Sequence, residues 1–558
     1  MRGDLVAGLT VAVVLIPQSM AYAILAGLPP VFGLYAAAVT PAIAGLWGSL
    51  RQLATGPIAI MSLLVLTTLA PFAEPGTSEF IRLAILLAFM VGVIYLGIGL
   101  FRLGEVMSFI SHSAVRGFTS AAAIIITTTQ LPHLLGVSVP RKEFIVSMLL
   151  ALAEKIPGLH VPTTLVGLLA LATIFVIQRV KKDFPASLIA IVVGTALVYA
   201  LDLEQAGIEV VGQIPGGLPG LQIPFLDFRT FCSLIGPAVI IALVSFAETY
   251  SVGKALSTET KQKVDVDQEF IGQGLANIVG SFFQSYPVSG SFSRTAVSYA
   301  SGAKTGIASV ISALSVVVAL LYLTPLIALI PKTALAALVI SAVMTLFHPK
   351  AVFHVWKMNR HDGIVAVSVF SLSLLTKPDY ALLIGVMISL MFFLWKTMHP
   401  RIVRISKDPE LNMFVNADVF DKPSCPQILQ LRSDNEIYFA NAEYTVAHIL
   451  ERLDEQTTPV KFLLLDLEAM GFVDITGVDE LRVLLDETRT RKMALALMGI
   501  HLPVMAVFKS SGFIRDLNPK YLIKRRGDAI GILFPDIDHD YCRSTCPYKL
   551  FYECSTVK

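Results

Sequence analysis

Residues 283–301 read FQSYPVSGSFSRTAVSYAS, a segment of small and hydroxyl-bearing residues that contains one arginine, Arg294. Apolar runs lie on both sides of it, but the segment is too polar, and too interrupted by Gly and Pro, to form an ordinary membrane span. At membrane depth, a backbone leaves the regular helix only where protein buries it or where it lines a water-filled cavity. An arginine at that depth indicates a functional site, and its charge favours an anion.

The composition is that of a membrane protein. Of the 558 residues, 55% are hydrophobic and only 15% are charged, whereas soluble chains carry about 25% charged residues. The net charge of +2 is too small to indicate nucleic-acid binding. Met1–Asp4 leads directly into apolar sequence without a signal-peptide cleavage pattern, so we expect the first apolar segment to be retained as a span. Five cysteines, three of them in the last 17 residues, do not form a disulfide framework.

The chain divides near residue 399, where long apolar runs give way to charged clusters. A span needs about 20 apolar residues, and by that measure roughly a dozen candidates precede Met398. We therefore expect a membrane domain at 1–398, a linker at 399–424, a small soluble domain at 425–535 and a cysteine-containing tail at 536–558. The basic residues Lys396, Arg401 and Arg404 place the soluble domain in the cytoplasm by the positive-inside rule. With an even number of spans, the amino terminus lies in the cytoplasm too. We expect an integral protein of the bacterial inner membrane.

The soluble part alternates between short apolar runs and helical patterns, which is typical of a small α/β domain. The runs are Gln427–Leu431, Ile437–Ala440, Lys461–Leu467 and Ala494–Met498, and the helical patterns are Glu443–Leu453, Gly477–Arg489 and Leu502–Lys509.

Two breaks in the span pattern resemble each other. Residues 51–62 read RQLATGPIAIMS and residues 284–293 read QSYPVSGSFS. Each is a short extended piece, then a Gly-containing break, then the start of a helix of small residues. Matching interruptions in two halves of a transporter indicate inverted repeats with the substrate at their interface. The alternative is two ordinary kinks, because Gly and Pro are common in membrane helices. If both breaks open half-helices, two helix amino-termini meet, and together they form an anion site.

Three stretches resemble the SulP family of anion transporters, the sulfate permeases and their relatives. They are LIPQSMAYA at 15–23 with LAGLPP at 25–30, GSLR and TGP at 48–57, and SGSFSRTA at 289–296. The soluble part resembles the STAS domain of that family. The resemblance implies a polytopic α-helical protein with fourteen spans in a seven-plus-seven inverted repeat, here about 4–201 and 230–398. It also implies a core domain that carries substrate against a gate domain, usually in a homodimer.

The resemblance also implies which residues hold the anion. They are Gln18 and Tyr22 in the first span, the half-helix that starts around Gly56 and Ala59, and Ser291, Ser293 and Arg294 in the second half-helix. The small residues at each helix start let backbone N–H groups approach a ligand closely. The alternatives are that the serines bond back within their helix, that Arg294 extends toward the interface, and that Gln18 and Tyr22 only join helices.

Glu248 is the second charge inside an apolar run. A carboxyl group is costly to keep ionised in a low dielectric and takes up a proton more readily there. Proton uptake would offset the charge of an incoming anion, so Glu248 is the candidate for proton coupling. An ion pair with Arg294 or Lys254 and a role as sodium ligand are the alternatives.

Two features outside the membrane part bear on function. FVDITG at 472–477 occupies the place of a loop in the STAS domain, and in anti-sigma-factor antagonists the hydroxyl residue of this loop is phosphorylated. Thr476 is therefore a candidate phosphorylation site. The alternative is that Thr476 caps the helix that follows. In the tail, His539, Cys542, Cys546 and Cys554 are a weak match to a zinc set, and a solvated or redox-active tail is the alternative. We expect no cofactor.

The sequence therefore predicts a secondary transporter of a small anion, most simply sulfate, that works by alternating access, is coupled to protons and is embedded in the lipid bilayer. Bicarbonate or dicarboxylate transport and anion exchange, coupled to sodium or uncoupled, suit the same residues. A nucleobase permease would rely on acidic residues and lack a STAS domain. A membrane sensor that signals to a cytoplasmic protein partner through its STAS domain is a different class. No nucleotide loop or nucleophile–base pair indicates an enzyme.

Overall fold

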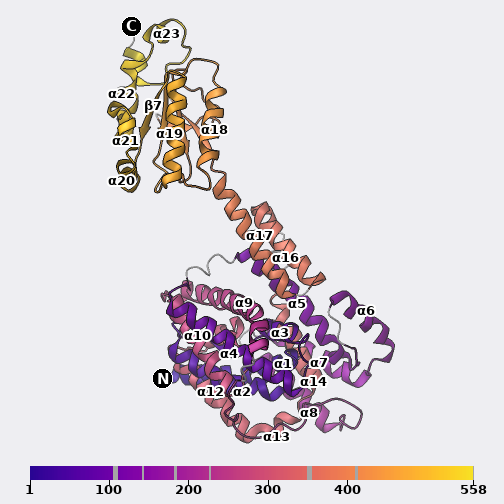
Figure 1. The fold of residues 1–558 in the computed structure, drawn as a ribbon. Helices are drawn as coiled ribbons and strands as arrows, with labels where there is room; N and C mark the ends of the chain where they lie inside the picture. The colour runs from indigo at the N-terminus through magenta and orange to yellow at the C-terminus, as the bar shows by residue number, and fades with distance from the viewer. Residues whose placement is uncertain are drawn as a thin grey trace. The chain divides into compact units, whose positions relative to one another are not determined.

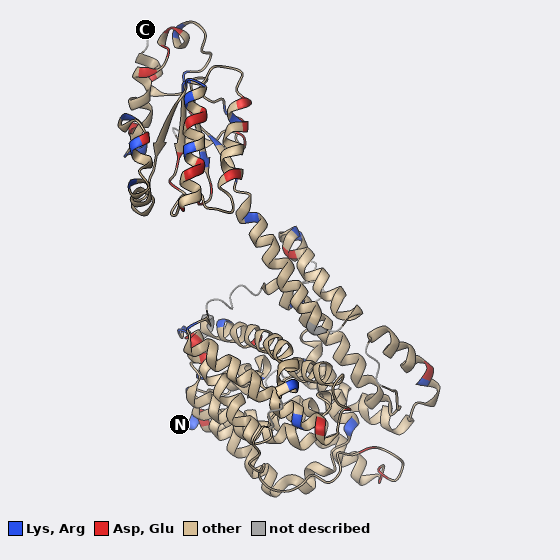
Figure 2. Cartoon of the chain, viewed as in Figure 1, with Lys and Arg blue, Asp and Glu red and all other residues tan. Residues whose placement is uncertain are grey.

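The computed structural model describes residues 1–104, 111–140, 144–180, 185–224, 228–347, 355–376, 378–408 and 413–556. The chain forms two compact units, Met1–Leu390 and Met391–Lys558 (Figure 1). The first is helical and the second is an α/β domain. In Figure 2, the helices of the first unit are almost entirely tan, whereas those of the second carry many blue and red segments. The composition boundary in the sequence thus separates two units of different chemistry.

Two sets of helices build the first unit, one from each half of its sequence. The first set comprises α1 (Arg2–Leu25), α2 (Pro30–Trp47), α3 (Ala59–Leu69), α4 (Ser78–Leu100), α5 (His112–Leu135), α6 (Ile145–Lys155), α7 (Val161–Val180) and α8 (Ala186–Ala200). The second comprises α9 (Phe228–Thr260), α10 (Val266–Phe282), α11 (Phe292–Ala300), α12 (Ile307–Val318), α13 (Thr324–Ala328), α14 (Lys332–Met344), α16 (Arg360–Leu375) and α17 (Pro378–Met398), the last of which runs on into the second unit.

Length and hydropathy mark part of these helices as membrane spans. Within the described residues, seven helices are long and apolar enough to cross a bilayer, and three further apolar helices are shorter, namely α3, α8 and α14. Large apolar side chains on α7 and α17, such as Leu165, Val176 and Trp395, are exposed, as expected for surfaces that face lipid.

Small residues let the helices of this unit pack closely. A Cβ atom on Gly33 of α2 would lie 2.0 Å from the carbonyl oxygen of Ser19 in α1. A Cβ atom on Gly117 of α5 would lie 2.3 Å from the carbonyl oxygen of Ala366 in α16. Such contacts are how membrane helices associate without a hydrophobic driving force. One group of helices packs around α1, α2, α4, α10 and α12, and another around α5, α7, α14 and α16. α1 also contacts α14 and α8, so it joins the two groups.

The second unit contains a six-stranded sheet in the order β4-β3-β5-β6-β7-β8. Its strands are β3 (Ile402–Asp408), β4 (Met413–Asn416), β5 (Ile428–Ser433), β6 (Phe462–Asp466), β7 (Ala494–Met498) and β8 (Leu522–Ile523). β5 to β8 are parallel, and β3 is antiparallel to both β4 and β5. The main helices are α18 (Ala442–Asp454), α19 (Ile475–Thr490) and α20 (Leu502–Ser510), followed by the short helices α21 (Phe513–Asp516), α22 (Ala529–Leu533) and α23 (His539–Ser544).

Side chains alternate across this sheet to build two cores. On β6, Leu463 and Leu465 face the core beneath α18 and α19. Phe462 and Leu464 face a second core that includes Phe534 and Phe551 from the C-terminal segment. Because successive residues of a strand point to opposite faces, both faces of the sheet are covered.

Two expectations for this unit need correction. The segment 399–424, expected to be a linker, contains β3 and β4, while residues 409–412 lie outside the described ranges. The run Ile437–Ala440 is not a strand, because only Ile437 forms an isolated bridge, to Val473, and turns follow it. The other predicted strands and helices are present with boundaries shifted by at most two residues.

Candidate functional site

Two short strands bring the breaks of the two halves together. β1 (Thr55–Gly56) pairs antiparallel with β2 (Ser289–Gly290), so Thr55 lies opposite Gly290. Each strand leads directly into a helix, because α3 begins at Ala59 and α11 begins at Phe292. The amide of Ser291 also donates to the Ala54 carbonyl oxygen at 3.0 Å, which continues the pairing to the start of α11. The two helix amino-termini therefore come from opposite halves of the unit and start beside the same pair of strands.

Arg294 lies in the first turn of α11 and is 1% exposed. Its Nη1 donates to Gln18 Oε1 at 3.3 Å, while Nε and Nη2 have no hydrogen-bond partner in the described part of the chain. Gly56 leaves room for the guanidinium, because a Cβ there would lie 3.3 Å from Nη2. A buried guanidinium with two unsatisfied nitrogen atoms is costly unless a ligand completes its hydrogen bonds. An anion supplies both the acceptor oxygens and the opposite charge.

Two tyrosines lie close enough to Arg294 to interact with its charge, and both are buried. Tyr22 comes from α1, one turn after Gln18. Tyr286 precedes β2, and its hydroxyl lies 3.2 Å from the Ser62 hydroxyl of α3. Sequence reasoning missed Tyr286, although it stands in the same segment as Arg294.

Most of the predicted site residues gather here. Gln18 contacts Arg294 directly, Gly56 lies beside its guanidinium, and Ala59 is the first residue of α3. Ser291 is the N-cap of α11, because its hydroxyl accepts a hydrogen bond from the Arg294 amide at 3.4 Å. Ser293 differs from the other predicted residues of this site because it is exposed, and its Oγ lies 3.4 Å from that of Ser291.

Glu248 lies on α9, and its Oε2 is buried without a hydrogen-bond partner in the described residues. The next residue, Thr249, fixes α9 to β2, since its hydroxyl lies 2.9 Å from the Ser289 hydroxyl and accepts from the Gly290 amide at 3.3 Å. Glu248 and Arg294 interact electrostatically, yet no salt bridge within 4.0 Å joins them in the part of the chain that the structure describes. The carboxyl group of Glu248 is therefore within the electrostatic field of Arg294 but does not form an ion pair with it in the described structure.

One face of α10 holds both breaks in place. Gln273 Nε2 donates to Thr55 Oγ1 at 2.8 Å, and Asn277 bonds Val288 through both its amide atoms, at 2.9 and 3.2 Å. Glu269 Oε2 accepts from the backbone amides of Ser49 and Leu50 at 2.9 and 3.1 Å. The sequence analysis did not predict a role for these three side chains either. Their signal was a polar residue at every fourth position of the helix, which places all three on one face.

A large cavity, of about 900 Å³, has a lining that contains none of the predicted site residues. Its lining includes the C-terminal part of α3 from Leu63 onward, together with His133 of α5 and Lys332 of α14. A salt bridge of 3.0 Å between Lys332 and Glu209 stands in its wall. Because a helix rises 1.5 Å per residue, Leu63, the first α3 residue of this lining, lies about 6 Å along the helix axis from Ala59.

In the second unit, the loop 472–477 has the predicted helix start but a different cap. Asp474 is the N-cap of α19, and its Oδ1 accepts from the Gly477 amide at 2.8 Å. Its Oδ2 accepts from the Phe439 amide at 2.9 Å. Thr476 is exposed in the first turn, so capping does not account for it. Its phosphorylation stays a prediction.

The predicted tail ligands are only partly gathered. Cys542, Cys546 and Cys554 line one small cavity, and Cys425 joins them there. His539 is not in that lining, and its ring packs against Phe534 at 5.1 Å between centroids.

In the first unit, two half-helices start beside the same pair of strands, and one of them carries a buried arginine. Such a helical unit, followed by an α/β domain, is typical of a class of membrane transporter. Residues 1–369 match the sulfate permease family and residues 420–524 match the STAS domain. The chain belongs to the sulfate permease family, a family of anion transporters.

Curated relatives cover almost the whole chain. Sulfate transporter 4.1, chloroplastic, from Arabidopsis thaliana is 34% identical over 547 residues, which are 95% of this chain and 79% of that protein. Sulfate transporter 1.2 of the same plant is 31% identical and covers 97% of this chain and 86% of its own length.

Solved structures share the fold. Murine Slc26a9, an anion transporter in the inward-facing state, superposes with a TM-score of 0.87 at 23% identity and covers 96% of this chain and 92% of its own. The transmembrane domain of the cyanobacterial bicarbonate transporter BicA gives a TM-score of 0.60 at 24% identity over 70% of this chain and 97% of its own. The predicted fold is confirmed, while the count of fourteen spans stays a prediction.

Proposed function

We propose that this protein is a secondary active transporter that moves a small anion, with sulfate as the first candidate, by an alternating-access, elevator-like mechanism. The observation that carries the proposal is Arg294, which is buried in the first turn of α11 beside Gly56 and has no partner for Nε and Nη2 in the described residues. Helix amino-termini bind anions through their free N–H groups and the helix dipole, and the guanidinium adds a full charge. Sulfate is put first because the relatives over 30% identical are named sulfate transporters.

The residues have separate roles in this proposal. Arg294 and the first N–H groups of α3 and α11 bind the anion, and Gln18, Tyr22 and Ser291 shape the site around it. Ser293, exposed beside Ser291, contacts the anion as it enters or leaves. The two strands tie the half-helices into one body, so the group of helices around α1, α2, α4, α10 and α12 carries the anion past the group around α5, α7, α14 and α16.

The position of Glu248 supports proton coupling as part of this proposal. Glu248 is half-buried, and its Oε2 is buried without a hydrogen-bond partner in the described residues. Such a carboxylate is costly to keep charged, and protonation lowers that cost. The proton also offsets one negative charge of the anion, which makes moving the loaded site across the bilayer less costly. Thr249 fixes the helix that carries Glu248 to β2, so the proton and the anion travel with the same body.

The remaining parts of the proposal concern the whole chain. The membrane domain covers 1–398 with repeats at about 4–201 and 230–398, both termini are cytoplasmic, the protein is a homodimer, and the host membrane is a bacterial inner membrane. The sheet that begins at β3 extends the STAS unit upstream of the expected boundary at 425.

Bicarbonate is the second candidate substrate, because a structural neighbour with the same membrane fold is named a bicarbonate transporter. Dicarboxylates, anion exchange, sodium coupling and uncoupled transport suit the same site. If the protein were a sensor that signals through the STAS unit, substitution of the exposed Thr476 would abolish signalling and leave uptake unchanged.

Uptake into proteoliposomes tests the proposal. Radiolabelled sulfate uptake is measured with an inward proton gradient, with a sodium gradient and with neither, and each of bicarbonate, a dicarboxylate and chloride is added as competitor. We expect saturable sulfate uptake that the proton gradient drives. Uptake driven only by sodium would refute the proton role, and full competition by bicarbonate would transfer the assignment to that anion.

A further inference from the structure

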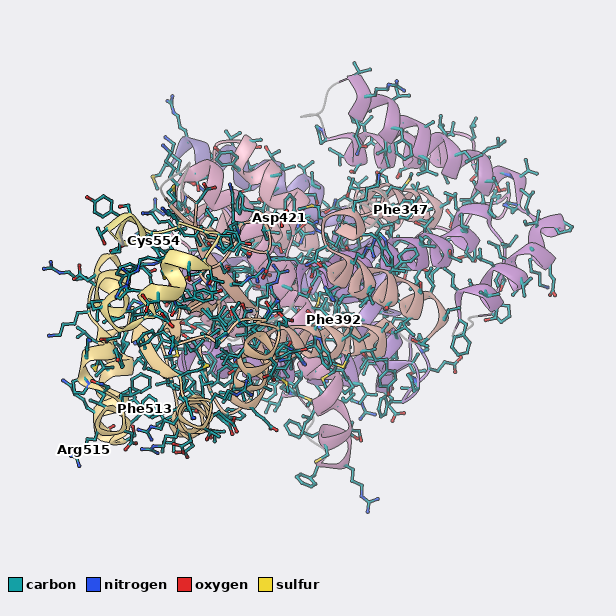
Figure 3. The ribbon with its side chains drawn as sticks, turned by 90° about the horizontal axis from the view of Figure 1, so that it is seen from above. Phe347, Phe392, Asp421, Phe513, Arg515 and Cys554 are labelled. Atoms are coloured by element: carbon teal, nitrogen blue, oxygen red, sulfur yellow. The ribbon has the colours of Figure 1, made fainter. Side chains whose placement is uncertain are left out.

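Four of the five cysteines line one small cavity in the second unit. They are Cys425, just before β5, and Cys542, Cys546 and Cys554 of the C-terminal segment. Figure 3 labels Cys554 beside the yellow C-terminal helices. The cavity has a volume of about 10 Å³, and its other walls are mostly carbon, from residues such as Ile428, Phe534 and Phe551. The fold therefore adds a fourth cysteine, from far upstream in the chain, to the three that the tail supplies.

The size and lining of this cavity select its occupant. About 10–15 Å³ is the space of one water molecule or one ion, and a buried water needs two to four polar partners. Almost no polar surface faces this cavity, so it is a poor site for water. Thiolate sulfur is the preferred ligand of soft metal ions, and four thiolates are a common set for structural zinc.

The thiols are free, and they lie close enough to interact. All five cysteines are unpaired. Cys425 interacts electrostatically with Cys546 and Cys554, and Cys542 interacts with the same two. Burial raises the pKa of Cys425 to about 11, so without a metal it is a neutral thiol at neutral pH. Hydrogen bonds already orient two of the sulfurs, because Cys542 accepts from Gln427 Nε2 at 3.2 Å and Cys546 donates to the Tyr548 carbonyl oxygen at 3.1 Å.

We propose that Cys425, Cys542, Cys546 and Cys554 bind one zinc ion, which fastens the C-terminal segment to the sheet of the STAS unit. Within the described residues, no group of three or more His, Cys, Asp or Glu side chains is arranged so that it could hold a metal ion without a change in conformation. Binding therefore includes rotation of the thiols toward the cavity that they line, with the loss of their protons to solvent. His539 is not part of the set, because its ring packs against Phe534 outside the lining.

Besides the cysteines, apolar packing and hydrogen bonds attach the C-terminal segment to the sheet. Leu550 and Phe551 enter the core on this face of the sheet, and Gln427 donates to the Asp538 carbonyl oxygen at 2.8 Å. The helices of this segment are short, so they gain little stability from their own hydrogen bonds. A tetrathiolate zinc site provides the cross-link that small, loop-rich segments of this kind need.

The test uses the full-length protein purified in detergent under reducing conditions without chelators. Elemental analysis by mass spectrometry gives zinc per chain, and a thiol-reactive dye counts accessible thiols. We expect about one zinc per chain and slow labelling of the four cysteines. Cys425→Ser and Cys554→Ser should each lower the zinc content at least fivefold, whereas Cys232→Ser, at the exposed cysteine of α9, and His539→Ala should retain it.

A wild-type experiment covers the case in which a variant fails to fold. A membrane-permeant zinc chelator should release the metal, expose four more thiols and speed hydrogen exchange across residues 536–556, while exchange of β6 stays slow. Less than a tenth of a zinc per chain with rapid labelling of all cysteines would overturn the proposal. So would disulfide bonds among the four cysteines, or loss of zinc in His539→Ala.

Discussion

Arg294 of α11 donates a hydrogen bond to Gln18 of α1 at 3.3 Å, although 276 residues separate them in the sequence. This bond uses one nitrogen of the guanidinium and leaves Nε and Nη2 unsatisfied in the described structure. Gln18 thus orients the arginine, and the unsatisfied nitrogen atoms are left for a ligand. The relationship joins the two halves of the membrane unit at the position where the anion is proposed to bind.

Substitution of Arg294 tests the anion site. Arg294→Ala removes the buried charge and two ligand hydrogen bonds, which at about 1.5 kcal/mol or more each corresponds to a loss of sulfate affinity of about 100-fold or more. Binding is measured by the thermal shift that sulfate produces in detergent. Arg51→Ala, at an exposed arginine near the other break, is the matched control and should bind normally. Normal sulfate binding by a folded Arg294→Ala protein would contradict the site.

Glu248→Gln separates the driving force from anion binding. The amide stays neutral at every pH, so it mimics the protonated carboxyl group and cannot release a proton. We expect proteoliposome uptake to lose its dependence on an inward proton gradient, while sulfate-induced thermal stabilisation and counterflow exchange persist. A variant that still accumulates sulfate against its gradient when protons are supplied would show that Glu248 is not the coupling residue.

Substitution of Gly56 tests whether the close approach of β1 to Arg294 is needed for anion binding. Its φ of +150° lies in a region that residues with side chains rarely adopt, and a Cβ there would lie 3.3 Å from Arg294 Nη2. Gly56→Ala should cost about 1–3 kcal/mol of local stability and move the guanidinium, which should weaken sulfate binding. Gly97→Ala in α4 is the control, because a Cβ there meets nothing within 4 Å. Equal sulfate affinities of the two variants would argue against this role.

Substitution of Glu269 tests whether its hydrogen bonds to residues 49 and 50 fix the chain just before the first helix break. Its buried carboxylate accepts from two backbone amides and from the Ser49 hydroxyl at 3.2 Å. Glu269→Ala leaves those donors unsatisfied and should destabilise this region by about 1–3 kcal/mol. The measurement is hydrogen exchange of the Ser49 and Leu50 amides, which should become faster. Glu79→Ala, at an exposed glutamate of α4, should leave that exchange unchanged.

Asp474 and Thr476 form a matched pair in the STAS unit. Asp474→Ala removes the cap of α19 and should cost about 1 kcal/mol, which is roughly a fivefold increase in exchange of the Gly477 amide. Thr476→Ala changes an exposed side chain, for which a change within about 0.5 kcal/mol is usual. If Thr476→Ala were the more destabilising of the two, the capping assignment would be wrong.

Much of the architecture was predictable from local patterns. The change in composition near residue 399 separates membrane and soluble parts because lipid and water select different side chains. The strands at 461–467 and 494–498 were predictable because buried parallel strands appear as short apolar runs. β3 was missed because Arg404 and Lys407 interrupt its apolar residues, and β4 was missed because it is short and lies at the edge of the sheet. Ile437–Ala440 was taken for a strand because a short apolar run does not reveal its pairing.

The sequence by itself determined which segments enter the membrane, where two helices are interrupted and that an arginine stands at one interruption. These properties depend on residues that are neighbours in the chain. Only the tertiary structure decided that Thr55 pairs with Gly290, that α10 holds both breaks, and that Cys425 meets the cysteines of the tail. A local pattern shows which face of an element is apolar, but it does not show which distant element covers that face. Contacts between distant residues form only when the whole chain packs, so the partners of Arg294 and of the cysteines become visible only in the folded protein.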